Sequence, residues 1–132
     1  MERTVNVSFP GGKRVDGEMD GRVVHTDQPP TAGGDGSAPT PFELFWISLA
    51  TCAGYFALEF CQSRKIATGG LSVRLKCRKN EEEKRFDRVT IELTLPGGFP
   101  EKYEAAIVRA VDLCTVKRHV MTPPEFSIQV VK

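Results

Sequence analysis

The sequence predicts an α+β fold, because strand-like and helix-like patterns alternate along the chain. Apolar and polar residues alternate over residues 4–9, 71–77 and 88–95, which is typical of strands with one buried face. Residues 41–65 carry an apolar pattern of helical length, and residues 101–114 carry an amphipathic helical stripe. The order strand, long helix, two strands, helix and strand indicates an α+β domain.

The length and charge of the chain limit its class. The 132 residues predict a single domain over residues 1–132, large enough to bury a core. The net charge of +1 gives no basic surface, so we expect no nucleic-acid partner and no membrane partner. The start, MERTVNVSF, lacks a secretory pattern, and the longest apolar run, 44–58, is shorter than the ~20 residues of a membrane span. We therefore expect a cytoplasmic protein in a reducing compartment.

The N-terminal third reads as short strands followed by a loop. A strand over residues 4–9 ends in a Pro-Gly-Gly turn at residues 10–12. Residues 21–27 form a second or third short strand. Residues 28–39, rich in Pro, Gly and small polar residues, form a loop that leads directly into the long helix.

The start of the long helix has a capping signature. Thr40 is a good N-cap, Pro41 suits the first helical position and Glu43 completes a capping box. We expect the helix to run to about Lys65 and to be buried on nearly every side, because residues 44–60 are apolar almost all round. A domain this small has difficulty surrounding such a helix alone, so its burial predicts packing against a second copy, that is, a homodimer.

The second half reads as a hairpin, a helix and a last strand. Residues 71–77 pair with residues 88–95, each with its apolar residues facing inward. The amphipathic helix over residues 101–114 follows, residues 114–121 add a short helical turn, and residues 124–132 supply a final strand.

Four cysteines lie at scattered positions: Cys52, Cys61, Cys77 and Cys114. Because no CxxC motif and no zinc-finger spacing occurs, we expect no structural metal. Nine helical residues turn through roughly 900°, which places Cys52 and Cys61 on opposite faces of one helix, so they do not pair. Cys77 points inward from a strand as a core residue.

Cys114 ends the stripe of the second helix, where the chain changes direction and can face the first helix. Two thiols brought together from two elements are typical of a nucleophile and a resolving cysteine, although small core residues are the alternative. Cys52 lies too deep in its helix for the N-terminal dipole to lower its pKa much, so activation would need a nearby cation.

The segments GGDGSAPTPFELFWISLATC (33–52) and AVDLCTVKRHV (110–120) carry a family resemblance. A proline-led helix start, a cysteine deep in that helix and a second cysteine in a later C-x-V segment resemble the OsmC/Ohr superfamily of small thiol-dependent hydroperoxide reductases. The resemblance implies an OsmC-like fold: a long buried central helix and a second helix packed on antiparallel sheets, in an intertwined homodimer with active sites at the interface.

The resemblance also implies a function and its site. Cys52 matches the peroxidatic cysteine and Cys114 the resolving cysteine, with no cofactor. The chain would reduce small apolar organic hydroperoxides in oxidative or osmotic stress defence. Cys52 would form a sulfenic acid, Cys114 would convert it to a disulfide, and an external dithiol would reduce that disulfide. The alternatives are a non-enzymatic module that binds apolar ligands and a sulfur or persulfide carrier.

Two further positions depart from the family pattern. In the family an arginine from the N-terminal β region contacts the thiolate, and a glutamate directly after the helix-start proline holds that arginine. Here Phe42 stands at that place and the carboxylate comes one residue later, at Glu43. Arg14 is the nearest candidate for the arginine and Arg22 the second. By helical rotation Glu43 points away from Cys52, so it would act only across a dimer interface, and capping is its alternative role.

Overall fold

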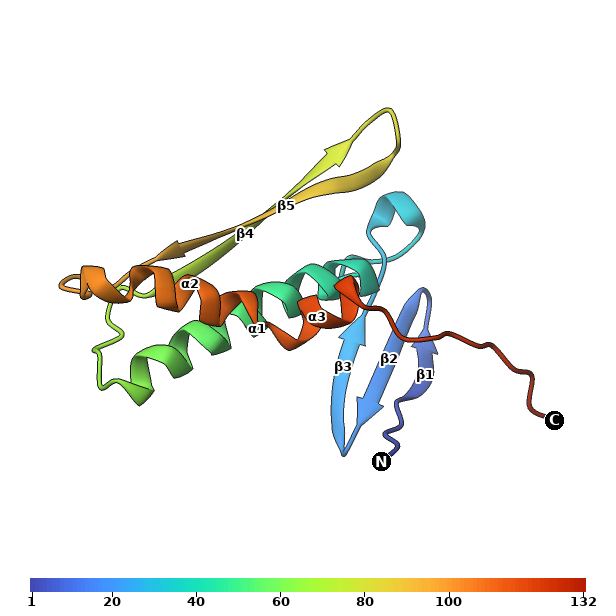
Figure 1. Cartoon of the computed structure of the whole chain (residues 1–132). Coiled ribbons are helices and arrows are strands. Elements are labelled where there is room, and N and C mark those ends of the chain that lie inside the picture. Colours follow the sequence, from blue (N-terminus) through green and yellow to red (C-terminus); the bar gives the residue numbers. More distant parts are fainter. The chain divides into compact units, whose positions relative to one another are not determined.

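The computed structural model describes residues 1–132 as an α+β protein with three α-helices and two small antiparallel sheets (Figure 1). The elements are β1 (Asn6–Gly11), β2 (Arg14–Met19), β3 (Arg22–Thr26), α1 (Pro41–Ser63), β4 (Ser72–Asn80), β5 (Arg85–Thr94), α2 (Glu104–Asp112) and α3 (Thr115–Met121), with short 3-10 turns at Pro30–Ala32 and Glu101–Tyr103. The chain divides into two compact units, Met1–Ile47 and Ser48–Lys132. The α+β class is thus confirmed, and the single domain stays a prediction.

The first unit contains an antiparallel sheet in the order β1-β2-β3. Strand β1 runs through Pro10 to Gly11, past the expected turn, with an irregular register between Ser8 and Gly11. An edge strand tolerates a proline, because one side of it makes no ladder hydrogen bonds. The strand expected over residues 21–27 is β3, the third strand of the chain. The structure also contains β2, for which no bounds were predicted from the sequence.

This sheet buries no apolar side chain. Within residues 1–47 only Thr26 and Asp27 are buried, while Val7 is 55% and Phe9 78% exposed. Small antiparallel sheets need an apolar face packed against another element for stability. The first unit therefore presents a sheet surface that its own residues do not cover.

Asp27 organises the loop between β3 and α1. Its buried carboxylate accepts hydrogen bonds from the backbone N–H groups of Gln28, Asp35 and Ser37 and from the Ser37 hydroxyl, at 2.7 to 3.3 Å. These bonds, the Ser37 hydroxyl first, lower the pKa of Asp27 to about 2. Gly34 is required in this loop, since a Cβ there would lie 2.0 Å from the Gln28 carbonyl oxygen.

The start of α1 has the predicted capping box. The Glu43 N–H donates to the Thr40 hydroxyl, and the Thr40 N–H donates to the Glu43 carboxylate, both at 3.1 Å. The helix ends at Ser63, close to the predicted end at Lys65, which has a left-handed φ of 55°.

The core of the second unit lies between α1, α2 and the β4–β5 sheet. Its buried residues come from the two helices, and half-buried apolar residues of both strands pack against them: Ala53, Ala57, Phe60, Cys61, Ile107 and Val111, with Val73, Ile91 and Leu93. The β4–β5 register pairs Val73 with Leu93. The alternation predicted for both strands is therefore confirmed, and each strand extends toward a turn in which the Asn80 side chain accepts two backbone N–H bonds.

In a single chain α1 is covered on one side, so its burial on nearly every side, which we expect in a homodimer, stays a prediction. Only five of its residues are buried, and Ile47, Thr51, Tyr55 and Leu58, which share one helix face, are exposed. The β4–β5 sheet, α2 and α3 pack on α1 and leave this face open. At 23 residues α1 is also long and apolar enough to cross a membrane, a property that it shares with core helices of soluble proteins.

The prediction of a final strand over residues 124–132 is wrong for the single chain. Residues 123–132 form no helix or strand, and Phe126, Ile128 and Val130 are 87%, 99% and 85% exposed. The strand pattern is present in the sequence, but a strand forms only where another strand supplies hydrogen-bond partners. In this chain no strand pairs with these residues.

Candidate active site

The second helical segment breaks at the position of Cys114. Instead of one helix over residues 101–114, α2 ends at Asp112 and the chain turns through Leu113 and Cys114 before α3 begins. Cys114 is the N-cap of α3, with φ −45° and ψ 125°. The turn directs this side chain inward, since Cys114 is only 1% exposed.

The Cys52 and Cys114 thiols are in hydrogen-bond contact. Cys52 is half-buried on α1, and its sulfur interacts with the Cys114 thiol and with the backbone N–H groups of Thr115 and Val116 in the first turn of α3. Burial by itself raises the pKa of Cys52, but these hydrogen bonds to the sulfur outweigh it, so the pKa lies below its usual value.

The pKa of Cys114 moves in the opposite direction. Burial raises it, and so do the hydrogen bond to Cys52 and the charge on the Cys52 sulfur, while backbone N–H groups of Lys117 and Val116 oppose the change. The pair is therefore chemically unequal: Cys52 loses its proton more readily than Cys114, whose thiol donates to the Cys52 sulfur. Two thiols in contact form a disulfide once an oxidant has converted one of them to a sulfenic acid, with which the other condenses.

The other two cysteines take no part in this contact. Cys61 is fully buried in the core, and burial raises its pKa despite the nearby Arg64. Cys77 is half-buried on β4, opposite Val89. Both match the structural roles that the sequence predicts, and the opposite orientations expected for Cys52 and Cys61 agree with the structure.

The candidate arginine and glutamate lie in the first unit. The Arg14 Nε donates to the Gly11 carbonyl at 3.2 Å, and Arg22 begins β3. Glu43 completes the capping box with Thr40. Arg14 and Glu43 thus make local contacts within the first unit. The action of the candidate arginine and of Glu43 on Cys52 stays a prediction.

The sequence reasoning missed the amide donors. It required a cation near Cys52, whereas the structure supplies backbone N–H groups of Thr115 and Val116. Such donors carry no side-chain signature, and only a helix start directly after Cys114 would have indicated them. No group of three or more His, Cys, Asp or Glu residues that could hold a metal ion occurs in the chain.

An apolar groove of about 430 Å³ lies in the second unit. Its walls come from α1, β5, α2 and α3 and are mostly aliphatic: Leu49, Val89, Ile91, Leu93, Val108, Val111, Asp112, Lys117, Val120 and Met121. Leu49 stands three residues before Cys52, on the same face of α1. The groove therefore reaches the helix face that carries Cys52.

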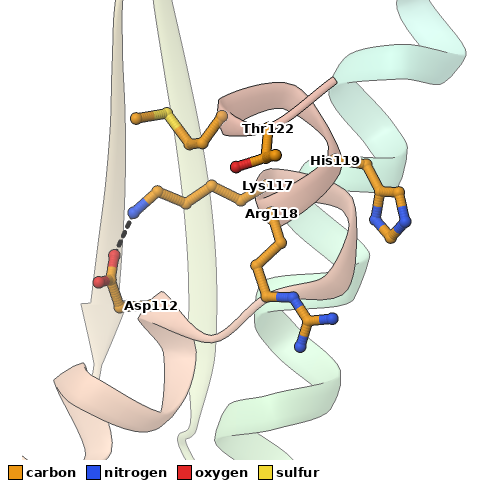
Figure 2. A pocket seen from close by; sticks show the side chains of 6 residues that line it. Asp112, Lys117, Arg118, His119 and Thr122 are labelled. Carbon is orange, nitrogen blue, oxygen red and sulfur yellow. Dashed lines mark hydrogen bonds and ion pairs between the residues drawn. The ribbon is translucent and has the colours of Figure 1, made fainter. Parts of the chain in front are cut away.

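A second, more polar pocket of about 490 Å³ shares Asp112, Lys117 and Met121 with the groove. Figure 2 shows the Lys117 side chain reaching across to the Asp112 carboxylate, with which it forms an ion pair. His119 lines the same pocket, and its Nδ1 lies 2.7 Å from the Thr115 carbonyl oxygen. His119 is exposed, and so is His25, which pairs with Asp16.

These features define a small α+β protein with a buried site of two unequal thiols. The profile of the OsmC-like protein family matches residues 34–129, and the chain belongs to that family. No curated protein sequence matches it.

Solved structures agree with this fold. A protein from Psychrobacter arcticus 273-4, named for the osmotic stress and detoxification response, matches at a TM-score of 0.74 and 21% identity, over 89% of this chain and 88% of that chain. The organic hydroperoxide resistance protein OsmC from Legionella pneumophila matches at 0.61 and 23% identity, over 89% and 88%. An organic hydroperoxide resistance protein from Elizabethkingia anophelis matches at 0.58 and 23%, over 90% and 89%.

Proposed function

We propose that this protein is a thiol-dependent peroxidase that reduces organic hydroperoxides. The observation that carries the proposal is the contact between Cys52 and Cys114, in which the pKa of the first thiol is lowered and that of the second is raised. Family membership supports it, as do the names of two structural relatives that confer organic hydroperoxide resistance.

The reaction has three steps. The Cys52 thiolate attacks the terminal oxygen of the hydroperoxide, the O–O bond breaks, and the alkoxide leaves and takes up a proton to give the alcohol. The Cys114 sulfur, on losing its proton, then attacks the Cys52 sulfenic acid, which releases water and forms the disulfide. An external dithiol reduces this disulfide by two exchanges and becomes oxidised itself.

The amides of α3 hold the thiolate before the first step. A sulfur anion that accepts backbone N–H bonds is stabilised without any side-chain cation. We further propose that Arg14 supplies a cation to Cys52 and that Glu43 holds this arginine across a dimer interface. In that arrangement the amides and the arginine stabilise the same thiolate together.

Uncovered apolar surface supports a homodimer. The exposed α1 stripe of Ile47, Tyr55 and Leu58 has the spacing of one helix face, and the sheet of the first unit and residues 123–132 leave further apolar side chains in solvent. Monomeric soluble proteins rarely leave large apolar patches exposed. In the proposed dimer, a second copy of α1 covers the stripe and strands of the partner subunit pair with residues 124–132.

The groove favours an apolar substrate. Its aliphatic walls suit the alkyl or aryl part of a small hydroperoxide, and Leu49 links it to the Cys52 face of α1. Hydrogen peroxide gains nothing from such walls, since it has no apolar surface to bury. We therefore expect kcat/KM to be higher for cumene hydroperoxide than for hydrogen peroxide.

The test is a set of cysteine variants. With dithiothreitol as reductant, wild type should consume cumene hydroperoxide and C52S should lose this activity. C114S treated with the hydroperoxide in the absence of dithiothreitol should stop at a sulfenic acid that dimedone captures. C77S is the matched control and should behave as wild type. Mass spectrometry of the oxidised wild type should find the Cys52–Cys114 disulfide. Full activity of C52S would refute the proposal.

The same groove favours a second candidate, a non-enzymatic module that binds apolar ligands. Its volume of about 430 Å³ and its aliphatic lining are typical of small-molecule sites. This function predicts tight binding of an apolar fluorescent probe by wild type and C52S alike, with no disulfide after treatment with hydroperoxide.

A further inference from the structure

The ion pair between Asp112 and Lys117 bridges the turn that carries Cys114. Asp112 is the last residue of α2, and Lys117 is the third residue of α3, so the pair closes a loop around the two junction residues. The Lys117 backbone N–H also bonds to the Cys114 thiol. Lys117 is thus tied to the cysteine through its main chain and to the preceding helix through its side chain.

The signs of the two charges are unfavourable for the helices themselves. The C-terminus of a helix favours a cation and its N-terminus an anion, yet Asp112 ends α2 and Lys117 stands in the first turn of α3. Each charge therefore opposes the dipole of its own helix. Only the contact across the turn makes the arrangement favourable.

We propose that the Asp112–Lys117 ion pair is a positioning device that holds the Cys114 thiol against Cys52. A disulfide requires a sulfur separation near 2.05 Å and a narrow range of Cβ distances, so small displacements of the turn weaken the contact. The inference rests on the proposed function, because it concerns the disulfide step of that reaction. Neither side chain takes part in the reaction itself, and both act on the disulfide step through the position of Cys114.

The size of the effect follows from exposure. The side chains of Lys117 and Asp112 are 40% and 67% exposed, so the pair has the modest strength of surface ion pairs. Such pairs contribute about 0.2–1 kcal/mol, which corresponds to about a 1.5- to 5-fold change in an equilibrium constant. We expect a change of this size in the constant for Cys52–Cys114 disulfide formation against dithiothreitol.

The test compares Asp112→Asn, Lys117→Met and the charge-exchanged double variant Asp112→Lys/Lys117→Asp. Both single variants should lower the disulfide constant about 1.5- to 5-fold and lengthen the lifetime of the Cys52 sulfenic acid, measured by dimedone capture. The exchanged variant should recover the wild-type constant. At 1 M NaCl, where the Debye length is about 3 Å, the difference between wild type and single variants should shrink.

Two readouts separate positioning from simpler explanations. A through-space effect of charge on the sulfurs would move the two single variants in opposite directions, whereas positioning moves both in the same direction. A purely stabilising role would lower the melting temperature of both without changing the disulfide constant measured well below that temperature, whereas positioning changes the disulfide constant there.

The matched control is Glu92→Gln, which breaks the comparably exposed Lys76–Glu92 pair on the β4–β5 sheet and should leave the disulfide constant unchanged. The positioning role would be overturned if both single variants kept the wild-type disulfide constant or if their constants shifted in opposite directions. It would also be overturned if the exchanged variant did not recover the wild-type constant. Absence of the disulfide in wild type would instead overturn the proposed function, and the positioning role with it.

Discussion

Replacing Ile107 with alanine should show how strongly the core holds α2 against α1. Ile107 has no exposed surface and packs in the cluster that contains Ala53, Ala57 and Phe60. The substitution removes three carbon groups, which at about 0.8 kcal/mol each amount to about 2.4 kcal/mol of lost burial. Ala53 and Ala57 have only methyl groups on a rigid helix and cannot fill the space, so a cavity adds to the loss.

We therefore expect Ile107→Ala to lower the free energy of unfolding by about 3–4 kcal/mol, within the usual range for such core truncations. Ile107→Val should cost about 1 kcal/mol. The control is Val108→Ala at a position that is 59% exposed, which should cost well under 1 kcal/mol. Urea unfolding followed by far-ultraviolet circular dichroism measures all three, at one protein concentration because a dimer's stability depends on it. Equal losses for Ile107→Ala and Val108→Ala would refute the reasoning.

Three further outcomes are expected. Cys114→Ala should raise the pKa of Cys52, because it removes the thiol hydrogen bond that lowers it. The measurement is the rate of Cys52 labelling by iodoacetamide across a pH series. A midpoint of that pH profile that does not move to higher pH would contradict the expectation. Asp27→Asn should lower the melting temperature at pH 7. Since the pKa of Asp27 falls from 3.8 to about 2 on folding, its contribution is present above about pH 3.8 and is lost as the pH falls toward 2, so wild type and variant should converge in melting curves recorded in that range. Tyr55→Glu should convert the proposed dimer to monomer, because pairing α1 helices would bury an uncompensated charge, and an unchanged sedimentation coefficient would exclude α1 from the interface.

Local chemistry made much of the fold predictable. The capping box of Thr40 and Glu43 and the alternation of β4 and β5 depend on neighbouring residues, and the structure has them as predicted. The rotation argument for Cys52 and Cys61 depends only on helix geometry, and it also held.

What the sequence did not predict depends on long-range contacts. The break at Leu113 and Cys114 interrupts a stripe that reads as continuous, and the amides that bond to Cys52 have no side-chain signature. The exposed side of α1 and the unpaired residues 123–132 have strong patterns but no partner within one chain. An apolar pattern indicates which face of an element is to be buried, and it does not indicate which other element or chain covers that face.

The place of α1 in the chain has a consequence for biosynthesis. Every element that contributes to the core around it, β4, β5 and α2, follows it in the sequence. At synthesis rates of about 5–20 residues per second, α1 is therefore outside the ribosome for a period on the order of seconds before those elements are complete. During that time a 23-residue apolar helix is open to chaperones and to the factors that recognise membrane segments. Rapid closure of the β4–β5 hairpin and α2 over α1 would shorten the time for which this apolar helix is exposed.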